Sequence, residues 1–343
     1  MRTIFLLLIV LFHSLTLQAL DLRFASWNIE RLGHGQQKSY ATLARVANQF
    51  DFLAIQELMT EEALHRLRQE LESVSGERWE AIHSHLLGPG SYKEMYGFIW
   101  RRSAVSYVDG AVVYLDDRQL FVREPYSARF RSRATEREFV AATVHVLYGR
   151  SVADRVAEVE ALSRYWQWLE EVYPETSLYL LAGDFNLAPS HAAWASLRRH
   201  ALPLIVEGAS TLSAVDGRYA NLYDNIWLPP RHVDEVVEAG VYRFPQQLGW
   251  SHEQARRHVS DHAPVYARIG AGARPIPREL PEAKPRAAVP RSGAEAVRGN
   301  RRSRIYHRPD CPGHGRIAEA NRVPFESPAA AEAAGYRLAG NCP

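Results

Sequence analysis

Short apolar runs that end in polar residues alternate with amphipathic stretches along most of the chain. The clearest run covers residues 178–182, ends at Gly183, and is followed by Asp184, Phe185 and Asn186. Its length and its flanking glycine predict a buried strand whose chain turns sharply at the end. Asp184 and Asn186 lie two residues apart, so in extended chain they point to the same side. The pair therefore either caps a turn or binds a ligand such as phosphate or a hard cation.

The same pattern predicts the other elements of the chain. Further strand-like segments cover 22–28, 52–55, 91–100, 105–114, 121–125, 139–146, 223–227 and 259–265. Apolar residues at helical spacing occur over 38–50, after Thr60 and, most regularly, over 152–172. We expect Thr60 to cap the second of these helices and Pro174 to end the third.

Polar residues recur where these strands end. They are Asn28, Glu57, His145, Asp184 with Asn186, and Asp261 with His262, while Asp224 accompanies a short strand of its own. Each has an ordinary explanation as a turn, a helix cap or a hydrogen-bonded part of the scaffold. Their recurrence favours a ligand site, because open sheets collect ligand groups along one edge.

Composition and charge narrow the choice of partner. The chain has 343 residues, enough for one large domain and a small one, with an ordinary soluble composition of 46% hydrophobic and 23% charged residues. Residues 271–343 carry 13 Arg/Lys and 7 Asp/Glu, whereas the whole chain carries a formal charge of only +2, so residues 1–270 are net −4. The main body would therefore bind a polyanion through a local patch or a metal ion.

The N-terminus resembles a targeting segment. Arg2 precedes an apolar run over residues 4–12, and Ala19 offers a cleavage position. An uncleaved anchor is the alternative, but the run is shorter than the roughly 20 residues that span a bilayer. We expect a signal peptide over 1–19, a periplasmic or secreted protein, and no stable membrane insertion after cleavage.

Residues 271–298 differ from the rest of the chain. Five prolines interrupt Ala, Arg and Glu without apolar periodicity, which predicts an exposed linker. The expected organisation is therefore a main domain over 20–270, the linker, and a small module over 299–343. The two cysteines, Cys311 and Cys342, both lie in that module, and in an exported chain they are expected to form a disulfide.

The polar residues suit phosphodiester hydrolysis. Asn28, Glu57 and Asp261 offer oxygen ligands for a hard divalent cation, which polarises a phosphoryl oxygen. One histidine beside a carboxylate can take a proton from water, and a second can protonate the leaving group. The chain has no Walker-type glycine loop, no G-x-S-x-G and no H-E-x-x-H, and the main body has no cysteine for thiol catalysis.

The same residues carry a family resemblance. Residues 27–29, 55–57, 183–186 and 260–262 resemble, in this order, the motifs of the endonuclease/exonuclease/phosphatase superfamily, over about residues 21–268. Residues 91–94 and 123–125 are similar to segments of its deoxyribonuclease I-like branch. The resemblance implies an α/β fold, a four-layered sandwich of two mixed β-sheets flanked by helices.

The resemblance also implies a role for each site residue. His262 would be the general base, oriented by Asp224. His145, oriented by Glu94, would act on the leaving-group side. Asp184 and Asn186 would position the phosphate and the water, and Tyr92 and Arg123 would contact the nucleic-acid backbone. Asn28 and Glu57, with Asp261 nearby, would hold Mg²⁺, with Mn²⁺ or Ca²⁺ as alternatives.

Two features depart from that branch. Met59 stands where the branch usually has an arginine that enters the minor groove, which argues against minor-groove reading. The disulfides of the branch are absent from the main body, because both cysteines lie in the last 35 residues.

The C-terminal module resembles the small metal-binding module of the Ada DNA-repair protein. That family uses four cysteines, whereas here only His307, Cys311 and Cys342 match and Ala339 replaces a ligand. A closed zinc site needs four ligands, so we expect the disulfide rather than zinc, which remains the alternative if His314 contributes. The arginines around this motif either hold phosphate backbone or form a solvated basic flank.

The sequence thus predicts an exported, monomeric, metal-dependent endonuclease acting on DNA, with RNA as a further substrate. A lipid or sugar-phosphate phosphodiesterase or phosphatase of the same fold is the alternative. Lipid enzymes of this kind tend to carry an apolar docking hairpin, and the chain has no such run. A binding protein without activity would lack a catalytic group, and none is missing.

Overall fold

The computed structural model describes residues 21–34, 37–270, 272, 275–276, 297–325, 327–340 and 342. The chain divides into two compact units, residues 1–282 and 283–343. The expected signal segment and most of the expected linker lie outside the described residues. Within the described part of the chain, no helix combines the length and the apolar character needed to cross a membrane.

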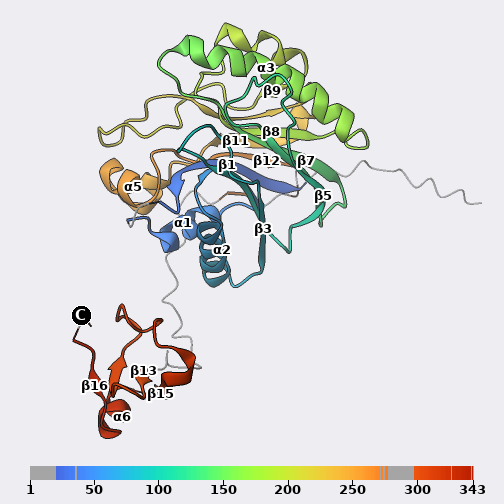
Figure 1. The fold of residues 1–343 in the computed structure, drawn as a ribbon. Coiled ribbons are helices and arrows are strands. Elements are labelled where there is room, and N and C mark those ends of the chain that lie inside the picture. Colours follow the sequence, from blue (N-terminus) through green and yellow to red (C-terminus); the bar gives the residue numbers. More distant parts are fainter. Residues whose placement is uncertain are drawn as a thin grey trace, which may run out of the picture. The chain divides into compact units, whose positions relative to one another are not determined.

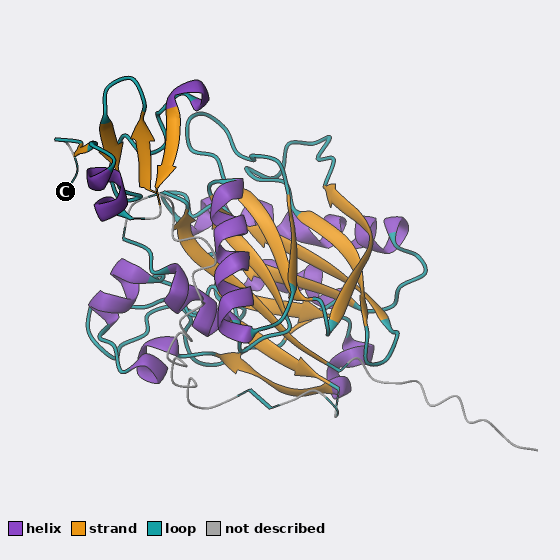
Figure 2. Ribbon diagram, turned by 90° about the horizontal axis from the view of Figure 1, so that it is seen from below, coloured by secondary structure: helices purple, strands orange, loops and turns teal. Residues whose placement is uncertain are grey.

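Two six-stranded mixed sheets pack face to face in the larger unit, with helices on their outer faces (Figures 1 and 2). The first sheet has the order β11-β12-β1-β2-β4-β3, and the second has the order β5-β6-β7-β8-β10-β9. The strands of the first sheet are β1 (Leu22–Leu32), β2 (Phe52–Leu58), β3 (Trp79–His83), β4 (Met95–Arg101), β11 (Val236–Val241) and β12 (Val265–Ile269). Those of the second are β5 (Val105–Val113), β6 (Tyr126–Ser132), β7 (Glu138–His145), β8 (Tyr179–Asp184), β9 (Leu202–Pro203) and β10 (Asp224–Leu228). The predicted four-layered α/β sandwich is confirmed.

The helices cover the outer faces because each presents an apolar stripe to a sheet. Leu43 of α1 and Leu67 of α2 share a core with Trp27 and Ile55 of the first sheet. On the other side, Trp166 of α3 lies in the core that covers the second sheet. The helices are α1 (Tyr40–Ala47), α2 (Glu61–Ser75), α3 (Val152–Val172), α4 (Phe244–Leu248) and α5 (His252–His258), with 3₁₀ turns at Ala192–Ala195, Leu197–Arg199 and Pro230–Glu235. As predicted, the Thr60 hydroxyl caps α2 by accepting a hydrogen bond from Ala63 N at 3.2 Å.

The inner faces of the two sheets meet in an aromatic core with one polar bridge. Phe52 of β2 packs edge to face on Phe130 of β6, with ring centroids 4.8 Å apart. Close to the strand ends, the Gln56 amide of β2 donates to the Thr143 hydroxyl of β7 at 2.7 Å, across the two sheets. This buried bond fixes the relative position of the sheets next to the edge where the polar residues gather.

Three predicted strand segments are shorter or absent in the structure. The strand predicted over 91–100 begins only at Met95, because Tyr92 and Lys93 are exposed after a glycine-rich turn. Residues 121–125 are not a strand, and Pro125 interrupts them. Residues 259–264 form a loop before β12, in which the Ser260 hydroxyl donates to the Asn28 carbonyl of β1 at 2.7 Å and His262 makes an isolated bridge to Thr211.

The smaller unit is built on a four-stranded sheet with the order β15-β13-β14-β16. Its elements are β13 (Val297–Asn300), β14 (Ile305–His307), β15 (Arg322–Phe325), β16 (Arg337–Leu338), α6 (Pro328–Ala333) and a 3₁₀ turn at Glu319–Asn321. Its apolar core is small, and a disulfide joins Cys311 to Cys342. One ligand atom of His307 lies within 4.8 Å of both sulfur atoms. The resemblance of this unit to the Ada module stays a prediction.

Candidate active site

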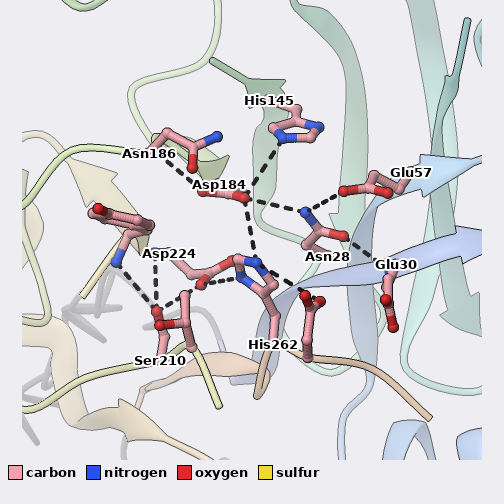
Figure 3. A network of polar contacts seen from close by, with 12 residues as sticks. Asn28, Glu30, Glu57, His145, Asp184, Asn186, Ser210, Asp224 and His262 are labelled. Carbon is pink, nitrogen blue, oxygen red and sulfur yellow. Dashed lines mark hydrogen bonds and ion pairs between the residues drawn. The ribbon is translucent and has the colours of Figure 1, made fainter. Parts of the chain in front are cut away.

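Three neighbouring strands of the second sheet bring acidic groups and a histidine to one edge (Figure 3). β7 and β8 are parallel and pair His145 with Asp184, so both strands end at the same level. β10 runs antiparallel to β8 and pairs its first residue, Asp224, with Asp184. The strand register therefore places all three side chains at one edge of the sheet.

Gly183 is required by the close approach of β7. A Cβ atom at this position would lie 1.9 Å from the Val144 carbonyl oxygen, far inside any allowed contact. The chain then turns at Asn186, which has a positive φ of 50°. The Asp184 carboxylate accepts a hydrogen bond from Asn186 N at 3.0 Å and thereby holds this turn.

The first sheet contributes side chains to the site from the irregular ends of β1 and β2. Glu30, Arg31 and Glu57 all have positive φ, where side chains are disfavoured, next to register shifts between β1 and β2. Such bulges redirect side chains and are common beside active sites. Here the Asn28 amide donates to Glu57 Oε1 at 3.0 Å and to Asp184 Oδ2 at 3.1 Å. Asn28 thus joins the two sheets at the site.

His262 and Asp224 form the first histidine–carboxylate pair. The His262 Nδ1 and Asp224 Oδ2 atoms lie 2.8 Å apart, and Asp224 is fully buried. The same carboxylate oxygen accepts a hydrogen bond of 2.6 Å from the Ser210 hydroxyl. Trp27 Nε1 donates to the His262 carbonyl at 2.8 Å. These contacts fix the ring, so that its free Nε2 faces the cleft, 3.7 Å from Asp184 Oδ2.

His145 and Glu94 form a second pair of the same kind. His145 Nδ1 lies 2.8 Å from Glu94 Oε1, and Glu94 has no exposed surface. The Tyr96 hydroxyl accepts from His145 N at 2.9 Å, and Arg123 Nη2 donates to the His145 carbonyl at 2.9 Å. His145 Nε2 lies 3.6 Å from Asp184 Oδ2. Both imidazoles therefore direct Nε2 at the same carboxylate from two sides.

The carboxylates raise the pKa of both histidines. Burial lowers the pKa of the His262 imidazole, but the charges of Asp224 and Asp184 outweigh it and leave the pKa well above its ordinary value. Burial likewise lowers the pKa of His145, and Glu94 more than offsets it. His145 is accordingly suited to give a proton. His262 can act as a base only when it is neutral, which requires that positive charge offset the carboxylates around it.

The oxygen-rich side of the site fits a hard divalent cation. The Glu57 and Asp184 carboxylates face each other across a single neutral amide, and Glu57 forms no ion pair with any described residue. Burial and the charge of nearby Asp261 raise the pKa of Glu30, which reflects the crowding of negative charge. Carboxylate and amide oxygens are the donor set that Mg²⁺ and Ca²⁺ require.

All the predicted catalytic and metal-binding residues lie in this region. One cleft of about 480 Å³ is lined by sixteen residues, of which eight were predicted, Tyr92 and Arg123 among them, and eight were not. The cleft is lined by Glu57, Tyr92, Arg123, His145, Leu147, Tyr148, Asp184, Asn186, Thr211, Leu212, Ala220, Asn221, Tyr223, Arg256, Asp261 and His262. Seven of the unanticipated residues lie outside the regular elements, where there is no periodic signal, and the eighth, Arg256, lies on α5.

The two predicted substrate-binding residues differ in their surroundings. The Tyr92 hydroxyl, 38% exposed as a residue, donates to Glu57 and Glu94 at 3.3 Å each. Arg123 is buried, and its guanidinium lies 3.5 Å from Glu94. Their contacts with nucleic acid stay a prediction. Met59 is buried, with only 6% of its surface exposed.

Comparison with known proteins yields one family and several relatives. The model of the Endonuclease/Exonuclease/phosphatase family matches residues 25–262. A deoxyribonuclease from Thioalkalivibrio sp. (strain K90mix) is 54% identical over 267 residues, 76% of this chain and 73% of that protein. Human deoxyribonuclease-1 is 30% identical over 282 residues, 72% of this chain and 92% of that protein.

Solved structures share the fold at low sequence identity. A protein of unknown function from Enterococcus faecalis V583 superposes with a TM-score of 0.54 at 14% identity, over 73% of this chain and 99% of that one. An endonuclease/exonuclease/phosphatase family protein from Bacteroides thetaiotaomicron has a TM-score of 0.51 at 17% identity, over 73% and 97% of the two chains. At this identity the likeness establishes the fold alone.

Proposed function

The chain belongs to the endonuclease/exonuclease/phosphatase family, and we propose on that basis that it is a metal-dependent endonuclease that hydrolyses phosphodiester bonds of DNA. The observation that carries the proposal is the pair of buried histidine–carboxylate dyads, whose free Nε2 atoms lie 3.6 and 3.7 Å from one Asp184 oxygen. One dyad can take a proton and the other can give one, on either side of a phosphate. The names of the two relatives favour DNA over other phosphodiesters.

Each dyad has its own task in this proposal. His262, held by Asp224, accepts a proton from the attacking water. His145, held by Glu94, gives a proton to the departing oxygen or donates a hydrogen bond to the phosphate. Asp184 and Asn186 orient the water and the phosphate between the two rings. The two protons move in opposite directions, so the total charge of the pair is unchanged by the step. His262 must then release its proton to solvent and His145 must take one up before the next turnover.

Asn28, Glu57 and Asp261 are the residues that would hold the divalent cation. Mg²⁺ is the proposed ion, with Mn²⁺ or Ca²⁺ as alternatives. A cation held there supplies positive charge that stabilises the negative charge developing on the phosphoryl oxygens. The same positive charge near Asp261 opposes protonation of the neighbouring His262, which the metal-free site favours.

A substrate panel separates this proposal from a lipid or sugar phosphatase of the same fold. Purified protein with Mg²⁺ is expected to nick plasmid DNA and to leave sphingomyelin vesicles and a sugar monophosphate intact. The absence of an apolar hairpin in the sequence supports this expectation. Hydrolysis of the vesicles or the sugar phosphate at rates above those for DNA would replace the DNA assignment with the alternative.

We also propose that the protein is exported and that its C-terminal module adds affinity for DNA. The support for export is the N-terminal apolar segment. The test is the mass of the protein recovered from the periplasm or the medium, which should correspond to a chain beginning at about Leu20. The support for DNA binding lies at the β13–β14 turn, where residues 301–304 are all exposed and three of the four are arginine. The Asn300 side chain accepts hydrogen bonds from Arg302 N and Ser303 N and holds this turn in place.

Charge reversal of the turn is expected to weaken DNA binding without affecting the chemistry. In Arg301→Glu/Arg302→Glu, the slope of log affinity for duplex DNA against log salt concentration should become shallower by about 0.9 for each lost phosphate contact. kcat should stay unchanged, because neither residue belongs to the cleft. Arg118→Glu/Arg133→Glu, on exposed arginines of the larger unit, is the matched control. Equal salt slopes in the two variants would refute a DNA-binding role for the turn.

A further inference from the structure

An exposed tyrosine stands at the rim of the catalytic cleft. Tyr148 lies three residues beyond His145 in the loop between β7 and α3, and 58% of its surface is exposed. It lines the same cleft as His145 and Asp184. The ring has no role in the proposed chemistry, and its position at the rim of the cleft leaves it available for contact with substrate.

A buried arginine supports one face of this ring. The Arg155 guanidinium lies 4.1 Å from the Tyr148 ring centroid and 5.6 Å from that of Tyr223. Arg155 is 6% exposed and is held by the carbonyl oxygens of Tyr148 and Asn186, each at 2.7 Å. Tyr223 packs edge to face on Tyr148 with ring centroids 6.5 Å apart. The three side chains form an aromatic shelf, which is anchored on the turn that carries Asn186.

The loop that carries Tyr148 is pinned along its length. Leu147 N donates to the buried Glu158 carboxylate at 3.0 Å, and the amides of Arg150 and Ser151 donate to Asp154 at 2.7 and 2.9 Å. Gly149 has φ +63°, and a Cβ atom there would lie 2.5 Å from the Asp154 side chain. The ring is therefore held in position before any ligand arrives, which lowers the entropic cost of binding.

The chemistry of this surface fits an unpaired nucleobase. Aromatic rings bind bases by stacking, without regard to sequence, because every base has a π-face. One face of Tyr148 is covered by Arg155, and the remaining exposed surface is available to a base. Arg150, which is exposed and lies two residues after Tyr148, supplies positive charge for a neighbouring phosphate. A base within a duplex is already stacked on both faces and cannot use such a shelf without leaving the helix.

We propose that Tyr148 is a stacking site for an unpaired base next to the scissile phosphate, and that it gives the enzyme a preference for single-stranded or locally unpaired DNA. The inference rests on the proposed DNA-cleaving function and names the substrate class of that site. Burial of Met59 agrees with it, because no side chain at that position extends from the surface toward a minor groove.

The test compares three substrates across four proteins. The proteins are wild type, Tyr148→Ala, Tyr148→Phe and Tyr107→Ala, in which Tyr107 is an exposed tyrosine of β5 outside the cleft. The substrates are a single-stranded oligonucleotide, the duplex of the same sequence, and bis(4-nitrophenyl) phosphate, a diester without bases. Thermal unfolding of each variant establishes that it is folded.

Wild type is expected to have a higher kcat/KM on the single strand than on the duplex. Tyr148→Ala should lower kcat/KM on the single strand by about 5- to 100-fold, the range for one stacked base. Activity on the small diester should change by less than about twofold, and the loss on the duplex should be much smaller than on the single strand. Tyr148→Phe keeps the ring and should behave as wild type, as should Tyr107→Ala.

Three results would overturn the inference, and they are distinguishable. An unchanged kcat/KM of Tyr148→Ala on the single strand would exclude stacking. An equal loss on all three substrates would assign Tyr148 a structural role in the loop. Wild type that hydrolyses the small diester but neither DNA would overturn the proposed function together with this inference.

Discussion

Replacement of His262 by alanine is expected to lower kcat for DNA cleavage by about 10²- to 10⁴-fold, the usual contribution of a general base. The imidazole is held by Asp224 at 2.8 Å, and its Nε2 faces the cleft 3.7 Å from Asp184. Water cannot replace a base that is positioned in this way, because free water is neither oriented nor as basic. KM for DNA should change little, since the ring makes few of the contacts that bind the strand. The measurement is steady-state cleavage of a labelled oligonucleotide with Mg²⁺.

A second histidine supplies the control for this substitution. His65 lies on α2 with its side chain 56% exposed, outside the cleft. His65→Ala should cleave at the wild-type rate. If His262→Ala retains more than about a third of the wild-type kcat, a general-base role worth two decades or more is excluded.

The pH profile separates the base from a merely structural histidine. Asp224 raises the pKa of His262, so its replacement in Asp224→Asn should lower that pKa. Activity that requires neutral His262 is lost as pH falls through this pKa, and the acidic limb of the profile should therefore move to lower pH. The maximum rate should also fall, because Asp224 no longer orients the ring. An acidic limb that stays in place would contradict the assignment of the base.

Replacement of Glu57 by glutamine is expected to weaken binding of the divalent cation by more than about tenfold, at 1.4 kcal/mol for each decade. The substitution removes one charge and nearly preserves the shape of a side chain that accepts hydrogen bonds from Asn28 and from Arg31 N. Calorimetric titration with Mg²⁺ or Mn²⁺ measures the affinity for the cation directly. The dependence of the cleavage rate on Mg²⁺ concentration measures it through activity.

Glu62→Gln is the matched control for the metal site. Glu62 is exposed in the first turn of α2, five residues after Glu57 in the chain. Its replacement by glutamine removes the same charge as Glu57→Gln does. It should bind metal as wild type does. If Glu57→Gln and wild type give the same metal affinity, the cation is bound elsewhere.

The candidate site was largely predictable because its residues follow strands. Strand ends can be recognised from apolar runs, and the parallel pairing of β7 with β8 then places His145 beside Asp184. The two dyads also join residues far apart in the chain, such as Asp224 and His262, and these pairings came from the family resemblance rather than from the pattern. The resemblance likewise supplied the fold, since an apolar run does not state which strand is its neighbour.

The parts of the site that the sequence did not predict lie on loops and depend on tertiary contacts. Ser210, which donates to Asp224, belongs to a segment with isolated bridges and no regular element. Tyr148 has no periodic context, and its exposure follows from how Arg155 on the next helix supports it. Residues 121–125 have strand-like composition, yet Arg123 is drawn inward by Glu94 and by the His145 carbonyl. Only the folded chain reveals contacts of this kind.

The most direct test of the proposed site is the rate at which supercoiled plasmid is nicked by wild type and by His262→Ala in the presence of Mg²⁺. The two histidine–carboxylate dyads predict rapid nicking by wild type, its loss on addition of EDTA, and a rate for His262→Ala that is lower by about two decades or more. Wild-type protein that leaves plasmid DNA intact with Mg²⁺, Mn²⁺ and Ca²⁺, or a His262→Ala variant as active as wild type, would contradict the account.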